Sequence, residues 1–89
     1  MTVRKHFRAH GHVQGVFFRD SVRREAARRG VAGWARNCAD GTVEGVFEGD
    51  SDAVAALLDI CRAGPGRAFT ERLDVADEPV EGLSEFRVS

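Results

Sequence analysis

Alternation of apolar and polar residues predicts strands in the first half of the chain. Charged and apolar residues alternate over residues 3–10, which predicts a first strand that glycines then interrupt. Residues 34–38 and 42–48 are short strand candidates on either side of Asp40-Gly41, a dipeptide that suits the positive φ angles of a hairpin turn. A two-residue and a four-residue loop would turn different faces inward, and the pattern leaves both open.

Helical periodicity marks two segments. From Asp20 to Arg29 the apolar residues fall on one side with arginines elsewhere, and Gly30 predicts the C-terminal end. After Asp50-Ser51, either of which could cap a helix, apolar residues recur at positions i, i+3, i+4 and i+7, namely Val54, Leu57, Leu58 and Cys61. This second helix is the clearest element, and Gly64-Pro65-Gly66 predicts where it stops.

The last third predicts strands again. Residues 69–75 alternate weakly, Pro79 and Gly82 mark a turn region, and Phe86 and Val88 predict a closing strand. The order β-α-β-β-α-β predicts an α+β fold, a ferredoxin-like sandwich with two helices on one face of an antiparallel sheet. We expect residues 1–89 to form a single domain, because 89 residues suit one small core. This architecture hosts many functions and does not choose among them.

The formal charge of −1 hides an uneven distribution. Residues 1–36 carry nine basic residues and two acidic ones, whereas residues 37–89 carry four basic residues and twelve acidic ones. A basic first third could attract an anion, although the two parts could equally neutralise each other in the folded domain.

No apolar run approaches the roughly 20 residues that cross a bilayer, and no signal peptide is evident, so we expect a cytoplasmic protein without membrane contact.

The metal-ligating residue types are sparse. Cys38 and Cys61 form no CxxC motif, which argues against a zinc ribbon or a disulfide framework, and both are expected in core or half-buried positions. His10 and His12 would share a strand face, but zinc needs three or four ligands. We therefore expect neither a metal nor a cofactor.

The segment from His12 to Arg19 carries the first candidate chemistry. A loop that enters a helix presents unpaired N–H groups, and the helix dipole adds about half a positive charge there. Gly15 would let the backbone approach a ligand, and Arg19 could bind phosphate oxygens with its forked guanidinium. Asn37, just before the hairpin turn, could hold a water or a phosphate oxygen. The plainer alternatives are a glycine-relieved turn with a solvated arginine, and an asparagine that satisfies the backbone.

Together the two stretches resemble the acylphosphatases. The resemblance covers nearly the whole chain, and it rests on the paired segments Gly11-His12-Val13-Gln14-Gly15-Val16-Phe17-Phe18-Arg19 and Gly33-Trp34-Ala35-Arg36-Asn37 followed by Asp40-Gly41-Thr42-Val43-Glu44. It implies a metal-independent hydrolysis of acyl phosphates to a carboxylate and phosphate. It also implies that Asn37 positions the attacking water and that Arg19 binds the phosphoryl group together with the backbone N–H groups of Gln14, Gly15, Val16, Phe17 and Phe18. The partner would be a small-molecule acyl phosphate, and we expect a monomer.

Residue chemistry agrees with that implication. The leaving carboxylate has a conjugate acid of pKa about 4, so its departure needs little help from a general acid. The transition state is loose with its charge on the phosphoryl oxygens, so positioning and electrostatic stabilisation could supply most of the catalysis. A site with one arginine, one asparagine and no evident base is therefore reasonable.

Several residues depart from the family pattern or offer other interpretations. His12 stands where the family often has Arg or Lys, and Ala35 where it often has Val. Phe17 could narrow the acyl side of the site, but we expect it to pack instead. Asp40 and Glu44 could form a carboxylate pair for acid–base catalysis. We expect instead that Asp40 belongs to the turn and that Glu44 lies on an exposed strand face.

Other functions remain as alternatives. The element order is also that of RNA-recognition domains, but those read bases with adjacent aromatics, and residues 42–48 hold only Phe47 and two glutamates. A nucleic-acid partner is therefore not expected. A non-catalytic anion-binding regulatory module, or an acylphosphatase-like unit of a larger maturation enzyme, would fit the same fold.

Overall fold

Five strands and two helices make up the computed structural model, which describes residues 1–89. In chain order they are β1 (Thr2–His12), α1 (Phe18–Arg29), β2 (Ala32–Asn37), β3 (Val43–Asp50), α2 (Ser51–Ala63), β4 (Phe69–Glu78) and β5 (Phe86–Val88). Every predicted element is present, with β1 and β4 longer than the pattern indicated. Asp50 caps α2 by accepting a hydrogen bond from the N–H of Asp52 at 3.2 Å. Neither helix is long and apolar enough to span a membrane.

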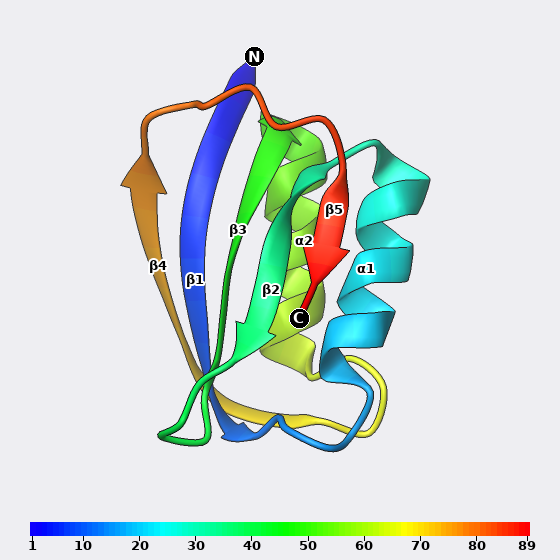
Figure 1. Cartoon of the computed structure of the whole chain (residues 1–89), viewed down its shortest axis with the longest axis vertical. Helices are drawn as coiled ribbons and strands as arrows, with labels where there is room; N and C mark the ends of the chain where they lie inside the picture. The colour runs from blue at the N-terminus through cyan, green and yellow to red at the C-terminus, as the bar shows by residue number, and fades with distance from the viewer.

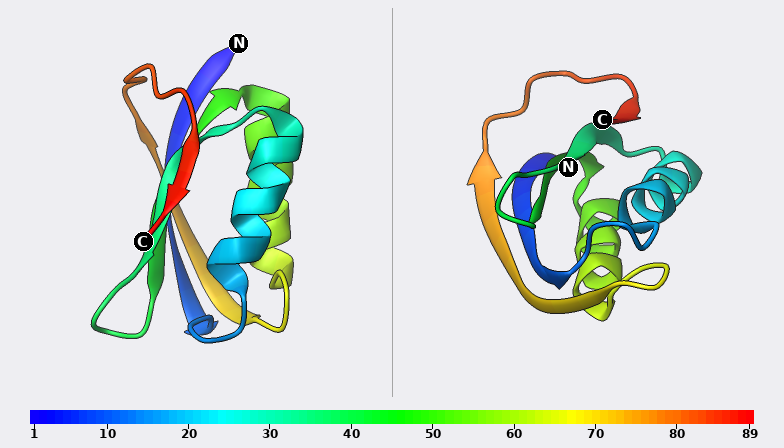
Figure 2. Two further views of the ribbon diagram at one scale, coloured as in Figure 1. Left: turned by 45° about the vertical axis from the view of Figure 1, so that its right-hand side comes forward. Right: turned by 60° about the horizontal axis from the view of Figure 1, so that its bottom comes forward.

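The strands form one sheet in the order β4-β1-β3-β2-β5, and both helices cover the same face (Figures 1 and 2). The ferredoxin-like α+β prediction is confirmed, but an entirely antiparallel sheet is not, because β5 pairs parallel to β2. The physical reason is visible in Figure 1, where the connection after β4 crosses over one end of the sheet. Strand β5 therefore starts at the end where β2 starts and runs in the same direction.

The β2–β3 hairpin has a longer connection than two residues. Pairing ends at Asn37 opposite Val43, and residues 38–42 lie outside both strands. Within this loop the N–H of Cys38 donates to the carbonyl of Thr42 at 2.8 Å. The Asp40 carboxylate accepts from the N–H of Thr42 at 3.0 Å and from its hydroxyl at 2.6 Å, which lowers the pKa of Asp40. The turn role predicted for Asp40 is confirmed.

The core lies between the sheet and the helices. Three phenylalanines from β1, β3 and β5 stack across the sheet, with ring centroids 4.6 Å apart for Phe7 and Phe47 and 5.7 Å apart for Phe47 and Phe86. Gly45 makes this stacking possible, because a Cβ atom there would lie 2.7 Å from the Phe7 ring and 2.3 Å from the carbonyl of Trp34. From α2, Leu57 and Cys61 are fully buried against the sheet.

The face of the sheet without helices carries ion pairs. Glu44 on β3 was predicted to be exposed, but its side chain is 13% exposed because the neighbouring strands surround it with two arginines and a histidine. Its carboxylate lies 2.8 Å from His6 Nε2, 3.2 Å from Arg8 Nη2 and 2.7 Å from Arg36 Nη2. The hydrogen bonds from His6 and Arg36 lower the pKa of Glu44 to about 2. The exposed-face prediction is wrong for this residue.

Candidate functional site

The segment between β1 and α1 leaves a row of backbone donors free. Helix α1 begins at Phe18, earlier than the predicted start at Asp20, so Arg19 is its second residue. The first helical hydrogen bond runs from the N–H of Ser21 to the carbonyl of Phe17 at 3.0 Å. No main-chain hydrogen bond outside the helices and strands is donated by residues 14–17. Because these N–H groups precede a helix N-terminus, their dipoles and that of the helix favour an anion at the same point.

Two residues of this segment have positive φ angles. Gly15 has φ 73°, which a glycine adopts without strain. Phe17 has φ 64° and is the only non-glycine residue in this region of conformational space, at a cost of roughly 1–2 kcal/mol. Its side chain is 65% exposed, so the expectation that Phe17 packs is wrong. The neighbouring Phe18, at 1% exposure, fills the core in its place.

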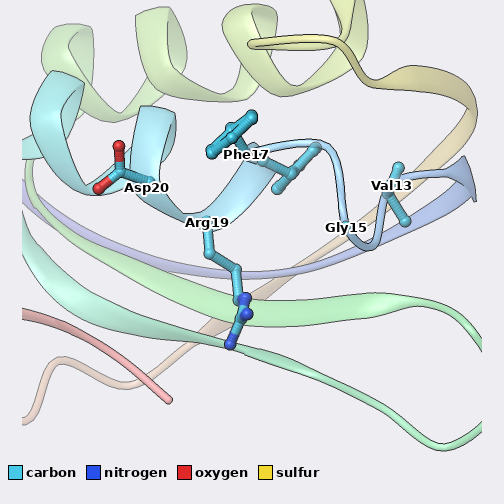
Figure 3. Close-up of a pocket in the computed structure, with 6 residues that line it drawn as sticks. Val13, Gly15, Phe17, Arg19 and Asp20 are labelled. Carbon is cyan, nitrogen blue, oxygen red and sulfur yellow. The ribbon is translucent and has the colours of Figure 1, made fainter.

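A hollow of about 270 Å³ opens beside this segment. Figure 3 shows the side chain of Arg19 extending from the start of α1 toward β2 and the end of β5, while that of Asp20 points away. The Asp20 carboxylate is instead held by Arg23 at 2.7 Å, which lowers the pKa of Asp20. The lining residues are Val13, Gly15, Phe17, Phe18, Arg19 and Asp20.

The charge of Arg19 has no aspartate or glutamate partner. Of the twelve arginines, only Arg19 and Arg67 have no side-chain carboxylate within 4.0 Å. The guanidinium of Arg19 instead donates through Nη1 to the main-chain oxygen of Ser89. An arginine without an aspartate or glutamate partner can stabilise a bound anion.

Contacts around β5 place Asn37 near the guanidinium group of Arg19. The N–H of Ser89 donates to the carbonyl of Ala35 at 3.1 Å, so the Arg19 head lies beside β2 at that position. Asn37 is two residues further along β2, about 7 Å from Ala35 along the strand, and lies on the same face as Ala35. Its side chain is exposed and forms no hydrogen bond. The structure thus brings Asn37 to the same end of the molecule as Arg19 without direct contact between them.

Gln14 connects the two candidate segments through its side chain. Its Nε2 donates to the carbonyl of Cys38 at 2.8 Å and to that of Thr42 at 2.9 Å. Those carbonyls belong to the hairpin loop that directly follows Asn37. The sequence assigned only a backbone role to Gln14, because an amide at one loop position gives no signal of which distant carbonyls it will reach.

Comparison with known proteins identifies the family. The sequence profile described as Acylphosphatase matches residues 5–88 of the chain. The chain belongs to the acylphosphatase family. An acylphosphatase of Gloeobacter violaceus is 55% identical over 86 residues, covering 97% of this chain and 92% of that protein. One of Thermococcus kodakarensis is 51% identical over 86 residues, covering 97% and 94% respectively.

Solved structures agree at the level of the fold. The structure of an acylphosphatase from Coxiella burnetii superposes with a TM-score of 0.93 at 36% identity, covering 99% of this chain and 93% of that chain. Membership of the acylphosphatase family confirms the resemblance predicted from the segments at residues 11–19 and 33–44, and it confirms the α+β sandwich.

Proposed function

We propose that this chain hydrolyses the carboxyl–phosphate bond of acyl phosphates to a carboxylate and inorganic phosphate. The proposal rests on the pairing, in a chain of this family, of free backbone N–H groups at residues 14–17 with an arginine that has no aspartate or glutamate partner. Both belong to one hollow at the N-terminus of α1. This combination suits the three equatorial oxygens of a phosphoryl group in transfer.

Arg19 and the backbone of residues 14–18 bind the phosphoryl group in this proposal. The N–H groups and the helix dipole are fixed by the fold, so they need little reorganisation as negative charge develops on the phosphoryl oxygens. The Arg19 guanidinium carries five donors, and the one that reaches Ser89 leaves others available to the phosphate. Binding an anion there satisfies donors that otherwise have no protein partner.

Asn37 orients the attacking water. The water oxygen bonds to phosphorus while the bond to the acyl oxygen breaks, and the electron pair of that bond leaves with the carboxylate. A phosphoryl oxygen takes up the proton of the water, so Asn37 acts as an orienting group and not as a base. No metal is assigned a role, because the arginine and the N–H groups supply the positive potential that a metal would otherwise provide.

Hydrolysis of acetyl phosphate in the presence of a chelator tests the proposal. The wild-type chain is expected to turn over the substrate, and Arg19→Ala to lower kcat/KM by roughly 10²–10³-fold, as removal of a transition-state donor does elsewhere. Asn37→Ala is expected to lower kcat more than the affinity for inorganic phosphate, because placement of the water matters chiefly in the transition state. An inactive wild type, or full activity of Arg19→Ala, would contradict the proposal.

A regulatory module that only binds anions is the second candidate, and the same experiment separates it. Saturable binding of inorganic phosphate to the wild type without any turnover of acyl phosphates would favour that function. The free donors at residues 14–17 support phosphate binding in both cases, so only turnover decides.

We further propose that the chain acts as a cytoplasmic monomer without a nucleic-acid partner. Phe47 is stacked inside the core, and the open face of the sheet carries Glu44 and Glu48, so it lacks the stacking platform of an RNA-recognition domain. The exposed edge strand β4 is rich in charged residues, which oppose edge-to-edge pairing. Two free cysteines suit a reducing compartment. Light scattering tests the monomeric state, and salt-dependent retention on RNA tests for a nucleic-acid partner.

A further inference from the structure

Two phenylalanines are strongly exposed near the same end of the molecule. Phe17 is 65% exposed and Phe69, at the start of β4, is 64% exposed. Only Phe17 lines the hollow that contains Arg19. The two residues are therefore matched in type and exposure but differ in whether a ligand in the hollow would meet them.

The backbone around Phe17 is held firmly while its ring is left free. The carbonyl of Phe17 accepts the first hydrogen bond of α1, and the carbonyl of Val16 accepts from the N–H of Arg67 at 3.1 Å. Phe18 is anchored in the core directly behind. The positive φ of Phe17 is thus imposed by its neighbours, and it carries an apolar ring to the rim of a hollow otherwise equipped for an anion.

We infer that Phe17 contacts the acyl group of the substrate and gives the enzyme a preference for aromatic over small acyl groups. This inference rests on the proposed function. In an in-line displacement the leaving acyl oxygen lies across the phosphorus from the attacking water. Asn37 orients that water from β2, and Figure 3 shows Phe17 on the opposite side of the helix start from the Arg19 guanidinium. The acyl group therefore projects toward the rim that Phe17 forms.

Kinetics with benzoyl phosphate and acetyl phosphate test this inference. Asparagine tolerates positive φ, so Phe17→Asn removes the ring without adding strain, and Phe69→Asn is the matched control. Phe17→Asn is expected to lower kcat/KM for benzoyl phosphate about 3- to 10-fold more than that for acetyl phosphate, the range of one aromatic contact, whatever the change does to the backbone donors that both substrates share. Phe17→Trp should keep the preference, and Phe69→Asn should leave both values unchanged.

A binding measurement separates recognition from chemistry. Phenacylphosphonate and acetonylphosphonate replace the bridging oxygen by a methylene, so neither is hydrolysed. Calorimetry is expected to show that Phe17→Asn weakens the binding of phenacylphosphonate more than that of acetonylphosphonate. If the wild type hydrolyses both acyl phosphates and Phe17→Asn lowers both rates equally or neither, the inference on Phe17 is wrong while the proposed function stands. If the wild type hydrolyses neither, the proposed function fails and this inference fails with it.

Discussion

Arg4 and Arg19 lie at opposite ends of the sheet, and their surroundings give the two charges different uses. Arg4, on β1, is 6% exposed and lies 3.6 Å from Glu48, 2.9 Å from Glu78 and 3.2 Å from Glu81. Arg19 is partly exposed and has no side-chain carboxylate within 4.0 Å; its guanidinium donates to the main-chain oxygen of Ser89. Removal of a partner from a buried, neutralised arginine destabilises the fold, whereas the charge of an arginine without a side-chain acid is available to a ligand.

The cluster around Arg4 holds the connection between β4 and β5. The Glu48 carboxylate accepts from the N–H groups of Glu81, Gly82 and Leu83 at 2.7, 2.8 and 2.5 Å. Burial opposes ionisation of Glu48, but the three N–H donors and Arg4 outweigh it and lower the pKa of Glu48. In Figure 1 this connection crosses the end of the sheet away from the hairpin and the loop before α1. The Arg4 end is therefore assigned to stability and the Arg19 end to chemistry.

The largest expected effect on stability is at Glu48. Glu48→Leu leaves Arg4 without its buried partner and three N–H groups without an acceptor, so we expect the free energy of unfolding to fall by about 3–5 kcal/mol. Asp74→Ala removes an exposed acid that is paired with Arg72 on the same face of the sheet as Glu48. It should lower the free energy of unfolding by less than about 1 kcal/mol. Urea unfolding curves of the two variants measure the difference. Equal losses would show that the Arg4 cluster has no special role.

Lowering the pH should weaken the ion pairs of Glu44 on the face of the sheet without helices. The pKa of Glu44 lies at about 2 in the folded chain against 4.5 ordinarily, so its contribution is complete above about pH 4.5 and is lost as the pH falls toward 2. The shift corresponds to roughly 2–3 kcal/mol. Unfolding free energies measured between pH 6 and 2.5 should fall less in Glu44→Gln than in the wild type. Parallel curves for both proteins would contradict the assignment.

Gln14 offers a way to disturb the site end without touching Arg19. Gln14→Leu removes both bonds to the hairpin loop and leaves two carbonyls unpaired, so we expect a loss of about 1–2 kcal/mol in stability. Because the hairpin follows Asn37, kcat should also fall several-fold. The inhibition constant of inorganic phosphate should stay within about 2-fold, since the backbone donors and Arg19 remain. A loss of phosphate affinity with unchanged kcat would show that the Gln14 side chain supports the phosphate-binding backbone of residues 14–17 and not the hairpin loop at residues 38–42.

The smallest effect is expected on the far turn of α1. Arg28 is exposed and paired with Glu25 at 3.3 Å, at the helix end away from the hollow. Arg28→Ala should lower kcat/KM by less than about 1.5-fold at low salt and not measurably at 0.15 M, because charges are screened over about 8 Å there. A larger effect that persists at high salt would mean that the basic helix as a whole, and not Arg19 alone, attracts the substrate.

The sequence predicted the elements well because their periodicities follow from local burial. The stripe of Val54, Leu57, Leu58 and Cys61 is buried on α2 as expected. The direction of β5 was missed because it depends on the path of residues 79–85, which the buried Glu48 directs from another strand.

At the site, as for β5, the features that the sequence missed depend on contacts between segments far apart in the chain. The motif indicated Arg19, Asn37 and the loop backbone, and these residues keep the roles proposed for them above. The side-chain bridge of Gln14 and the exposure of Phe17 depend on φ angles and on contacts between distant segments. Neither leaves a pattern in a single sequence. The same holds for Glu44, whose burial comes from side chains on β1 and β2.

The central claim is that Arg19 serves chemistry and not stability, and one preparation of Arg19→Ala tests it. Its free energy of unfolding in urea and its kcat/KM for acetyl phosphate should be measured on the same preparation. We expect a free energy of unfolding within about 0.5 kcal/mol of the wild type, as for surface substitutions, together with the roughly 10²–10³-fold loss of kcat/KM. A variant that is destabilised but keeps its activity would contradict the role assigned to Arg19.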